Sequence, residues 1–228
     1  MSQELLDKIN SRGYWRVVIR PTEYREENIS LGEIRKTLDS TVLHLRGWDY
    51  PHIDRSNTTN GQNYVQSYAD FLGNIEFWRF YQSGQFINRF AMREDWHEVS
   101  SIFGTGKPLP FKSLDIIETL YNVTEIVEFA TRLAVKGIYG KNIKIEISLC
   151  DTNDRALASI YSHRWLSRDY VCKIPEIKWE KLILTEELIS NSAEISMNAT
   201  LYIFERFNWN TSADIFKDDQ QKLLSGRL

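Results

Sequence analysis

Runs of β-branched and aromatic residues predict strands along most of the first 95 residues. Three of these runs are bounded by turn-forming residues: 13–21 (GYWRVVIRP), 41–48 (TVLHLRGW) and 64–71 (YVQSYADF). A hairpin follows within 73–92, and a two-residue turn at Ser83-Gly84 would place Trp78 opposite Arg89. Aromatic side chains occur on both faces of this hairpin, which predicts that it lies in the middle of a covered sheet.

Apolar residues recur at helical spacing in three stretches: 30–40, about 113–136, and a stretch that begins at Thr185. Ser30, Ser113 and Thr185 stand where N-capping residues are expected. Gly137 stands where the second helix would end. Residues 142–149 (NIKIEISL) alternate between polar and apolar, which predicts a further strand.

Together these elements predict an α+β fold, with a mixed or mostly antiparallel sheet, a central aromatic hairpin and two long helices packed against the sheet. We expect a single α+β domain over residues 1–228, with the Gly/Pro loop at 100–112 as the candidate sub-boundary. Both halves are expected to share one sheet. Residues 1–10 are expected to form a short helix or a free end.

The composition is that of an ordinary globular protein, with 42% hydrophobic and 26% charged residues. A formal net charge of −3 argues against a protein that binds nucleic acid over its whole surface, but it allows a local basic site.

Cys150 and Cys172 lack CxxC spacing and are interpreted as core thiols. No apolar run approaches the ~18 residues of a membrane helix, and residues 1–10 do not resemble a signal peptide. We therefore expect a cytoplasmic protein with no membrane span and no cofactor.

Alternation along the predicted strands gathers arginine and aromatic side chains, and these form a candidate binding face if the strands share one side of the sheet. The face comprises Arg16, Arg20, His44, Arg46, Trp48, Trp78 and Arg89. Guanidinium groups bind phosphates and aromatic rings stack on bases, so such a face suits a nucleic acid or a phosphate-bearing ligand. The alternative is a solvated sheet face on which arginines lie over tryptophans.

Arg79 is a separate case, because the predicted register surrounds it with apolar rings. A charge in such a place is costly unless it is paired and hydrogen-bonded. We expect a structural ion pair with a carboxylate from a covering helix: Glu118, Glu125 or Glu128. Membership of a binding site is the other interpretation of Arg79.

His52 and Asp54 follow the predicted strand at 41–48 in a His-x-Asp pattern. Such a pair can orient an imidazole for acid–base work or begin a metal site, with His97 and Glu98 as further ligands. A lone His-x-Asp is not specific, and a tight turn capped by Asp49 is the alternative.

Four stretches carry a resemblance: VIRPTEY, HLRGWDYPHI, EFWRFYQSGQF and IFERFNW, which spread over about residues 14–210. They resemble uncharacterised prokaryotic proteins, in some of which a similar region follows a Schlafen-AlbA-type DNA-binding domain. The chain itself shows no separate copy of that domain. The resemblance implies an association with nucleic-acid-linked or antiviral-defence machinery, and it transfers no catalytic residue.

These observations predict a non-catalytic binding or adaptor protein that uses the Arg/aromatic face on a nucleic acid, a phosphate-bearing ligand or a partner protein. The first alternative is a metal-dependent hydrolase or nuclease that uses His52 and Asp54. The second is a structural subunit of a homo- or hetero-oligomer, with the aromatic hairpin as its interface.

Overall fold

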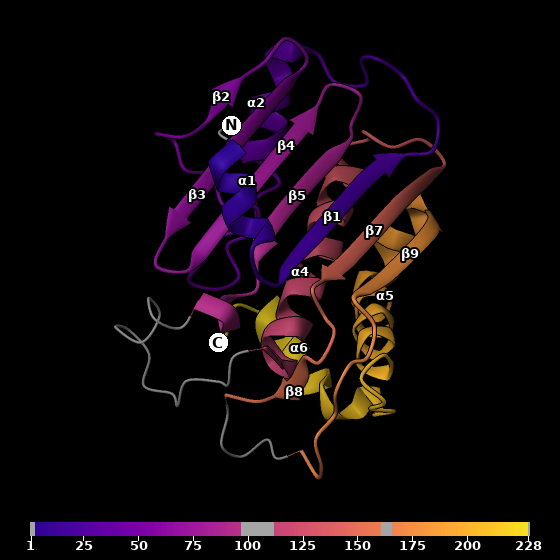
Figure 1. Cartoon of the computed structure of the whole chain (residues 1–228). Coiled ribbons are helices and arrows are strands. Elements are labelled where there is room, and N and C mark those ends of the chain that lie inside the picture. Colours follow the sequence, from indigo (N-terminus) through magenta and orange to yellow (C-terminus); the bar gives the residue numbers. More distant parts are fainter. Residues whose placement is uncertain (1–2, 97–111, 161–165, 228) are drawn as a thin grey trace.

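An antiparallel sheet of seven strands organises the chain, in the order β2-β3-β4-β5-β1-β7-β9 (Figure 1). The computed structural model describes residues 3–96, 112–160 and 166–227. The strands are β1 (Tyr14–Pro21), β2 (Thr59–Asn60), β3 (Tyr64–Phe71), β4 (Asn74–Tyr81), β5 (Phe86–Ala91), β7 (Asn142–Cys150) and β9 (Glu176–Leu184). Because β1 pairs with β5 on one side and with β7 on the other, the sheet joins the two halves of the chain.

Helices cover the two faces of the sheet unequally. They are α1 (Gln3–Asn10), α2 (Leu31–Asp39), α4 (Ile116–Val135), α5 (Thr185–Glu205) and α6 (Lys217–Leu224). The smaller elements are two 3-10 turns, η1 (Arg93–Trp96) and η2 (Ala213–Ile215), and a parallel pair, β6 (Ser113–Asp115) and β8 (Ala156–Ala158). Figure 1 shows α4 and α5 behind the sheet and the short α1 in front of it. The front face is therefore covered by much less helix than the back face.

Strand alternation explains where the core lies. On β1, Trp15, Val17 and Ile19 point toward the long helices and are buried, while Arg16 and Arg20 point to the front. The same alternation buries β7, and the resulting main core includes apolar residues of α2, α4, α5 and α6. A smaller second cluster lies in front, where Leu5 and Ile9 of α1 pack on β4 and β5.

The predicted α+β fold is confirmed, with the hairpin β4–β5 inside the sheet and two long helices against one face. The predicted 64–71 and 142–149 strands match β3 and β7 closely. Gly137 has a φ of +77°, as expected for the residue that follows a helix end. Cys150 and Cys172 are both buried. Most of the proposed sub-boundary at 100–112 lies outside the described residues.

The predicted strand at 41–48 is wrong. Leu43 instead forms an isolated bridge with Tyr50, and each of the two donates a backbone hydrogen bond to the other's carbonyl. The segment folds back on itself, so its backbone groups do not pair with the main sheet. This places Arg46 and Trp48 in a loop.

The predicted hairpin register is wrong by one residue. The turn holds three residues, because Tyr81 N–H bonds to the carbonyl of Gln85 and Gly84 adopts a φ of +82°. Trp78 consequently lies opposite Asn88. Since a shift of one residue moves a side chain to the other face, Trp78 and Arg89 lie on opposite sides of the sheet.

None of the three expected N-capping residues caps its helix with its side chain. Thr185 is the first residue of α5, and Leu184 stands at the N-cap position. Asp115, rather than Ser113, caps α4, and its Oδ1 accepts hydrogen bonds from the N–H groups of Ile117 and Glu118. Ser30 precedes α2 but makes no side-chain capping bond.

In the part of the chain that the structure describes, no helix is long and apolar enough to cross a membrane.

Candidate functional site

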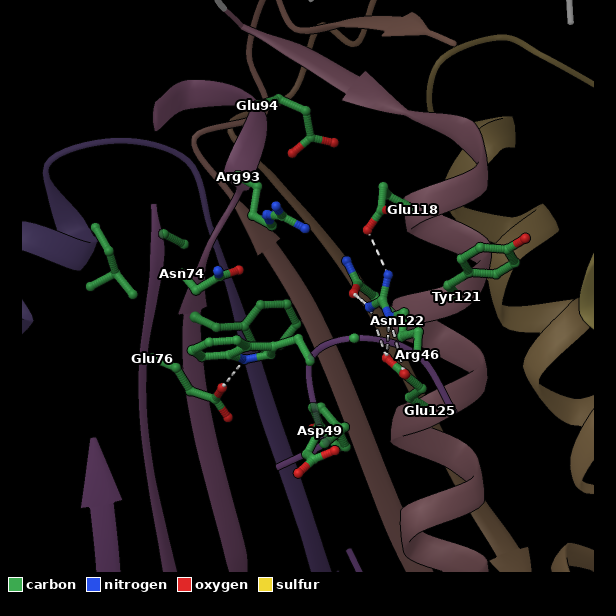
Figure 2. A pocket seen from close by; sticks show the side chains of 16 residues that line it. Arg46, Asp49, Asn74, Glu76, Arg93, Glu94, Glu118, Tyr121, Asn122 and Glu125 are labelled. Carbon is green, nitrogen blue, oxygen red and sulfur yellow. Dashed lines mark hydrogen bonds and ion pairs between the residues drawn. The ribbon is translucent and has the colours of Figure 1, made fainter. Parts of the chain in front are cut away.

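A cavity of about 440 Å³ lies behind the sheet, between the loop at 46–50, strands β4 and β5, and helix α4 (Figure 2). We call it the acidic cavity, because five carboxylates line it: Asp49, Glu76, Glu94, Glu118 and Glu125. The basic residues in its wall are Arg46 and Arg93. A space of this size accommodates a small organic molecule.

Arg46 fixes the loop to α4. Its guanidinium donates to both oxygens of Glu125 at 2.8–3.1 Å, to Glu118 at 2.6 Å and to the side-chain oxygen of Asn122 at 2.6 Å. These three partners share one face of α4, because their spacing of four and three residues follows the helical repeat. Arg46 is thus the central group of a partly buried polar network that positions the loop.

The two carboxylates bound to Arg46 differ in their response to burial. Burial raises the pKa of Glu118, but the attraction of Arg46 and Arg93 is larger in sum and leaves that pKa below its ordinary value. The pKa of Glu125 remains raised, because burial outweighs the attraction of Arg46. The neighbouring charges account for the difference, because Arg93 also attracts Glu118, whereas Glu118 and Asp49 repel the charge of Glu125.

Glu76 projects from β4 into the cavity and is 4% exposed. Its carboxylate accepts hydrogen bonds from Asn88 Nδ2 at 3.0 Å, Trp48 Nε1 at 3.3 Å and the backbone N–H of His52 at 3.4 Å. All three donors are neutral. Burial raises the pKa of Glu76 to about 7, and these hydrogen bonds offset only part of that shift.

Glu94 lies at the other end of the cavity, on η1, and is 8% exposed (Figure 2). One oxygen accepts a hydrogen bond from the backbone N–H of Asp115 at 2.8 Å. Burial raises the pKa of Glu94 to about 7. Within the described residues, neither Glu76 nor Glu94 has a lysine or arginine nitrogen within 4 Å. The cavity therefore holds two carboxylates that are about half-ionised at neutral pH.

Aromatic side chains form the apolar part of the cavity wall. They are Trp48, Tyr50, Phe90 and Tyr121. The Trp48 ring stacks on His52 with the ring centroids 3.8 Å apart, and Tyr50 meets Phe90 edge-on. Carboxylates beside aromatic rings favour a cation, since both the negative charge and the ring faces attract it. A guanidinium or ammonium group attached to a flat or apolar body matches this wall.

The structure divides the predicted Arg/aromatic face between the two sides of the sheet. Arg46 and Trp48 line the acidic cavity. Trp78 is fully buried in the core, where its Nε1 donates to the carbonyl of His52 at 2.6 Å. His44 is exposed, with its Nδ1 2.7 Å from Asp49 Oδ1. These four residues belong to the loop and the helix side of the sheet.

The remaining predicted residues, Arg16, Arg20 and Arg89, lie on the front face. The expectation that all seven residues share one face is therefore wrong. The hairpin register and the false strand at 41–48 account for the error. Because Trp78 is fully buried in the chain's own core, it is not accessible to a ligand or a partner chain.

Arg79 does not form the ion pair that was expected of it. Its guanidinium donates twice to Gln66 Oε1, at 2.7 and 3.0 Å, and once to the Tyr81 hydroxyl. It also lies over the Tyr64 ring, 4.1 Å from the centroid. The predicted pairing with Glu118 and Glu125 is made by Arg46 instead, since Arg79 points to the front of the sheet.

His52 and Asp54 are not arranged as a catalytic pair. Asp54 caps a turn and accepts hydrogen bonds from Ser56 and Asn57, which hold its pKa below its ordinary value. His52 is stacked on Trp48, and burial lowers its pKa. Across the described ranges, no group of three or more His, Cys, Asp or Glu side chains is placed to hold a metal. His97 and Glu98 lie outside those ranges, so the predicted metal site stays a prediction.

Sequence reasoning missed Glu76 and Glu94 as functional candidates. Glu76 had a detectable signal, because alternation places it on the same face of β4 as the buried Trp78 and Phe80. A carboxylate at a core-facing position is unusual and marks a polar site. Glu94 had no comparable signal, since its burial depends on packing against the distant Asp115.

In comparisons with known proteins, no family model, no curated protein and no solved structure matches this chain.

Proposed function

We propose that the chain is a binding protein that recognises a small organic cation in the acidic cavity. The observation that carries the proposal is the pair Glu76 and Glu94, two buried carboxylates that face a cavity and have no cationic partner among the described residues. A bound ammonium or guanidinium group would supply the missing charge and form charge-assisted hydrogen bonds.

The organic nature of the ligand follows from the shape and chemistry of the wall. The cavity is larger than an ion requires, and its aromatic side includes Trp48, Tyr50 and Phe90. Ligand sites of this kind combine an apolar wall with a few polar groups that fix orientation. Arg46 is already occupied by Glu118, Glu125 and Asn122, and the charge of Arg93 acts on Glu118. The five carboxylates of the wall outnumber these two arginines, which favours a cation over an anion.

Binding of a cation should be linked to pH. The pKa of Glu76 and that of Glu94 are both raised to about 7, so each carboxyl group is partly protonated at neutral pH. A cation favours the ionised form and therefore releases protons when it binds. Affinity should rise with pH between about 6 and 8, by roughly tenfold for each carboxyl group that must ionise.

Benzamidine provides the test, because benzamide is its neutral analogue and benzoate its anionic analogue. Isothermal titration calorimetry should show that benzamidine binds at least about tenfold more tightly than either analogue. Glu94→Gln should weaken benzamidine binding, whereas Glu33→Gln, a change at an exposed carboxylate on α2, should not. Equal affinity for benzamidine and benzamide, or tighter binding of benzoate, would contradict the proposal.

An acid–base enzyme that uses the same cavity is the second candidate. The specific observation in its favour is that two carboxyl groups have a pKa of about 7, where a group can both accept and donate a proton. One experiment distinguishes the binding protein from the enzyme. A ligand that native mass spectrometry detects on the purified protein is released and incubated with fresh protein. Recovery of the unchanged ligand supports binding alone, and conversion to a new compound supports the enzyme.

A further inference from the structure

We propose that the front face of the sheet carries a second site, an arginine groove that binds the phosphates and bases of single-stranded nucleic acid. The groove has a volume of about 200 Å³, and its wall includes Leu6, Arg16, Phe77, Arg79, Ile87 and Arg89. It lies on the opposite side of the sheet from the acidic cavity and shares no lining residue with it. This proposal is independent of the one made for the cavity.

Strand pairing brings the arginines of the groove together. Arg16 on β1 lies directly opposite Arg89 on β5. Arg79 on β4 lies opposite Ile87, which is two residues from Arg89 and therefore on the same face. Helix α1 forms a side wall through Leu6.

The charges of these arginines are only partly compensated. Two like charges directly opposite each other on adjacent strands repel. Arg16 has a carboxylate partner, Glu176, at 2.7 Å. Over the described part of the chain, Arg20, Arg79 and Arg89 have no carboxylate within 4 Å. A basic patch of this kind on a chain with a net charge of −3 is a local feature that calls for an anion.

The guanidinium groups keep hydrogen-bond donors available. Arg79 uses three of its five N–H groups on Gln66 and Tyr81. Among the described residues, Arg89 donates a single hydrogen bond, which is long at 3.5 Å and goes to Asn10 on α1. Free N–H pairs on a planar guanidinium match two phosphate oxygens at once.

Guanidinium planes and partly exposed apolar side chains in the groove suit nucleobases. Leu6 and Ile87 are partly exposed in its wall, while Phe77 is 4% exposed and forms its floor. The Arg79 guanidinium lies over the Tyr64 ring, so its other face is the one that a base could stack on. Unpaired bases stack on rings and on guanidinium planes, whereas a duplex keeps its bases stacked inside. The groove therefore favours a single strand over a duplex.

The spacing of the arginines favours an oligonucleotide over a single phosphate. Arg16 and Arg20 are four residues apart on β1, which corresponds to roughly 13 Å along the strand. Beyond β1, the carboxylates of Glu146 and Glu180 on β7 and β9 are paired with Lys144 and Lys178. These four side chains balance one another in charge, so the nucleic acid should follow the uncompensated arginines of β1 and β5 rather than cross β9.

Fluorescence anisotropy with a labelled 12-nucleotide RNA of mixed sequence, and with the DNA of the same sequence, tests the proposal. Arg20→Gln with Arg89→Gln removes two uncompensated charges that hold little internal structure. We expect at least about tenfold weaker binding. The slope of log K against log salt should fall by about 0.7 for each lost phosphate contact. Arg25→Gln with Arg35→Gln is the matched control. Both arginines are exposed and lie away from the groove, and the two substitutions remove the same amount of charge as Arg20→Gln with Arg89→Gln.

Several results would overturn the inference. One is the absence of an anisotropy change with the native protein up to about 100 µM, where even non-specific nucleic-acid binding is detectable. Another is an equal loss of binding in the Arg25/Arg35 control, which would show a charge effect without a site. A third is equal affinity for the strand and its duplex. Glu94→Gln should leave RNA binding unchanged, so failure of one site is separable from failure of the other.

Discussion

The two faces of strand β4 place opposite charges in opposite surroundings. Glu76 points to the back, into the acidic cavity under α4, where it is 4% exposed. Three residues later Arg79 points to the front, into the arginine groove beside α1, where it is partly exposed. Burial shifts the ionisation of Glu76 to near neutral pH, whereas Arg79 lies beside Gln66 and over Tyr64 at the surface of the sheet. One strand can therefore serve two sites, since alternation keeps their chemistries apart.

Burial of a side chain, more than its charge, decides how a polar group contributes to stability. A buried charge in the acidic cavity is coupled to its partners, and removal of one partner leaves another charge buried. A partly exposed charge in the arginine groove is screened by water, so its removal has little effect on folding.

Removal of Arg46 should cause the largest loss of stability. Arg46→Met leaves the buried Glu125 without a cation and Glu118 with Arg93 alone, and it should lower the free energy of unfolding by about 3–5 kcal/mol at neutral pH. Urea unfolding measures this quantity. Addition of Glu125→Gln to the variant should restore part of the loss, because it removes the buried charge. A loss below about 0.5 kcal/mol would show that the network does not hold the loop.

Neutralisation of Glu94 should increase stability at high pH. The pKa of Glu94 is raised to about 7 from an ordinary value of 4.5, so the native protein binds this proton more tightly than the unfolded chain. That contribution is fully present below about pH 4.5 and is lost as pH rises through about 7.

Glu94→Gln removes this pH dependence. Its stability relative to the native protein should grow by about 2 kcal/mol between pH 5 and pH 8. Urea unfolding at both pH values checks the difference, with Glu33→Gln as the exposed control. A difference that does not change with pH would show that Glu94 titrates normally.

The three-residue turn can be tested at Gly84. This residue has a φ of +82°, and a Cβ atom there would lie 2.7 Å from Ile138 Cγ2. Gly84→Ala should therefore lower the free energy of unfolding by about 1–2 kcal/mol, measured by thermal or urea unfolding. Gly32→Ala, in a helix with open space around it, should not destabilise the protein. A neutral Gly84→Ala variant would contradict the observed turn, and with it the assignment of Arg89 to the front face.

Removal of Arg89 should have the smallest effect on folding. Arg89→Gln relieves the repulsion with Arg16, and we expect a change within about 1 kcal/mol, in the stabilising direction at low salt. Urea unfolding at low and high salt measures the change, which should shrink as salt screens the repulsion. A clear destabilisation would mean that Arg89 has a structural role, and the contrast between groove and cavity would not hold.

Elements with a strong local pattern were predictable from the sequence. Strand β3 and strand β7 alternate clearly, and the helix that ends before Gly137 has a continuous apolar face. The errors came from features that local patterns do not encode. One extra residue in the turn at Gly84 reverses the face of Arg89, and the bond between Leu43 and Tyr50 closes a loop that looks like a strand.

The candidate site was predictable only in part. Arg46 and Trp48 were identified as binding residues, and both line the cavity, but they were assigned to the wrong face. Their true neighbours come from β4, η1 and α4, which are far apart along the chain. Glu118 and Glu125 were expected to face an arginine of the sheet, and an arginine of the loop takes that place. Long-range packing decides which arginine meets which carboxylate.

The most direct test of the account is a carbon-13 NMR titration of the side-chain carboxyl groups, with Glu76 and Glu94 assigned by their Gln variants. Both groups should titrate with a pKa of about 7 in the free protein. Benzamidine should lower both values, because a bound cation favours the ionised carboxylate. Ordinary values near 4.5 for both groups, unchanged by benzamidine, would contradict the acidic cavity as a cation site.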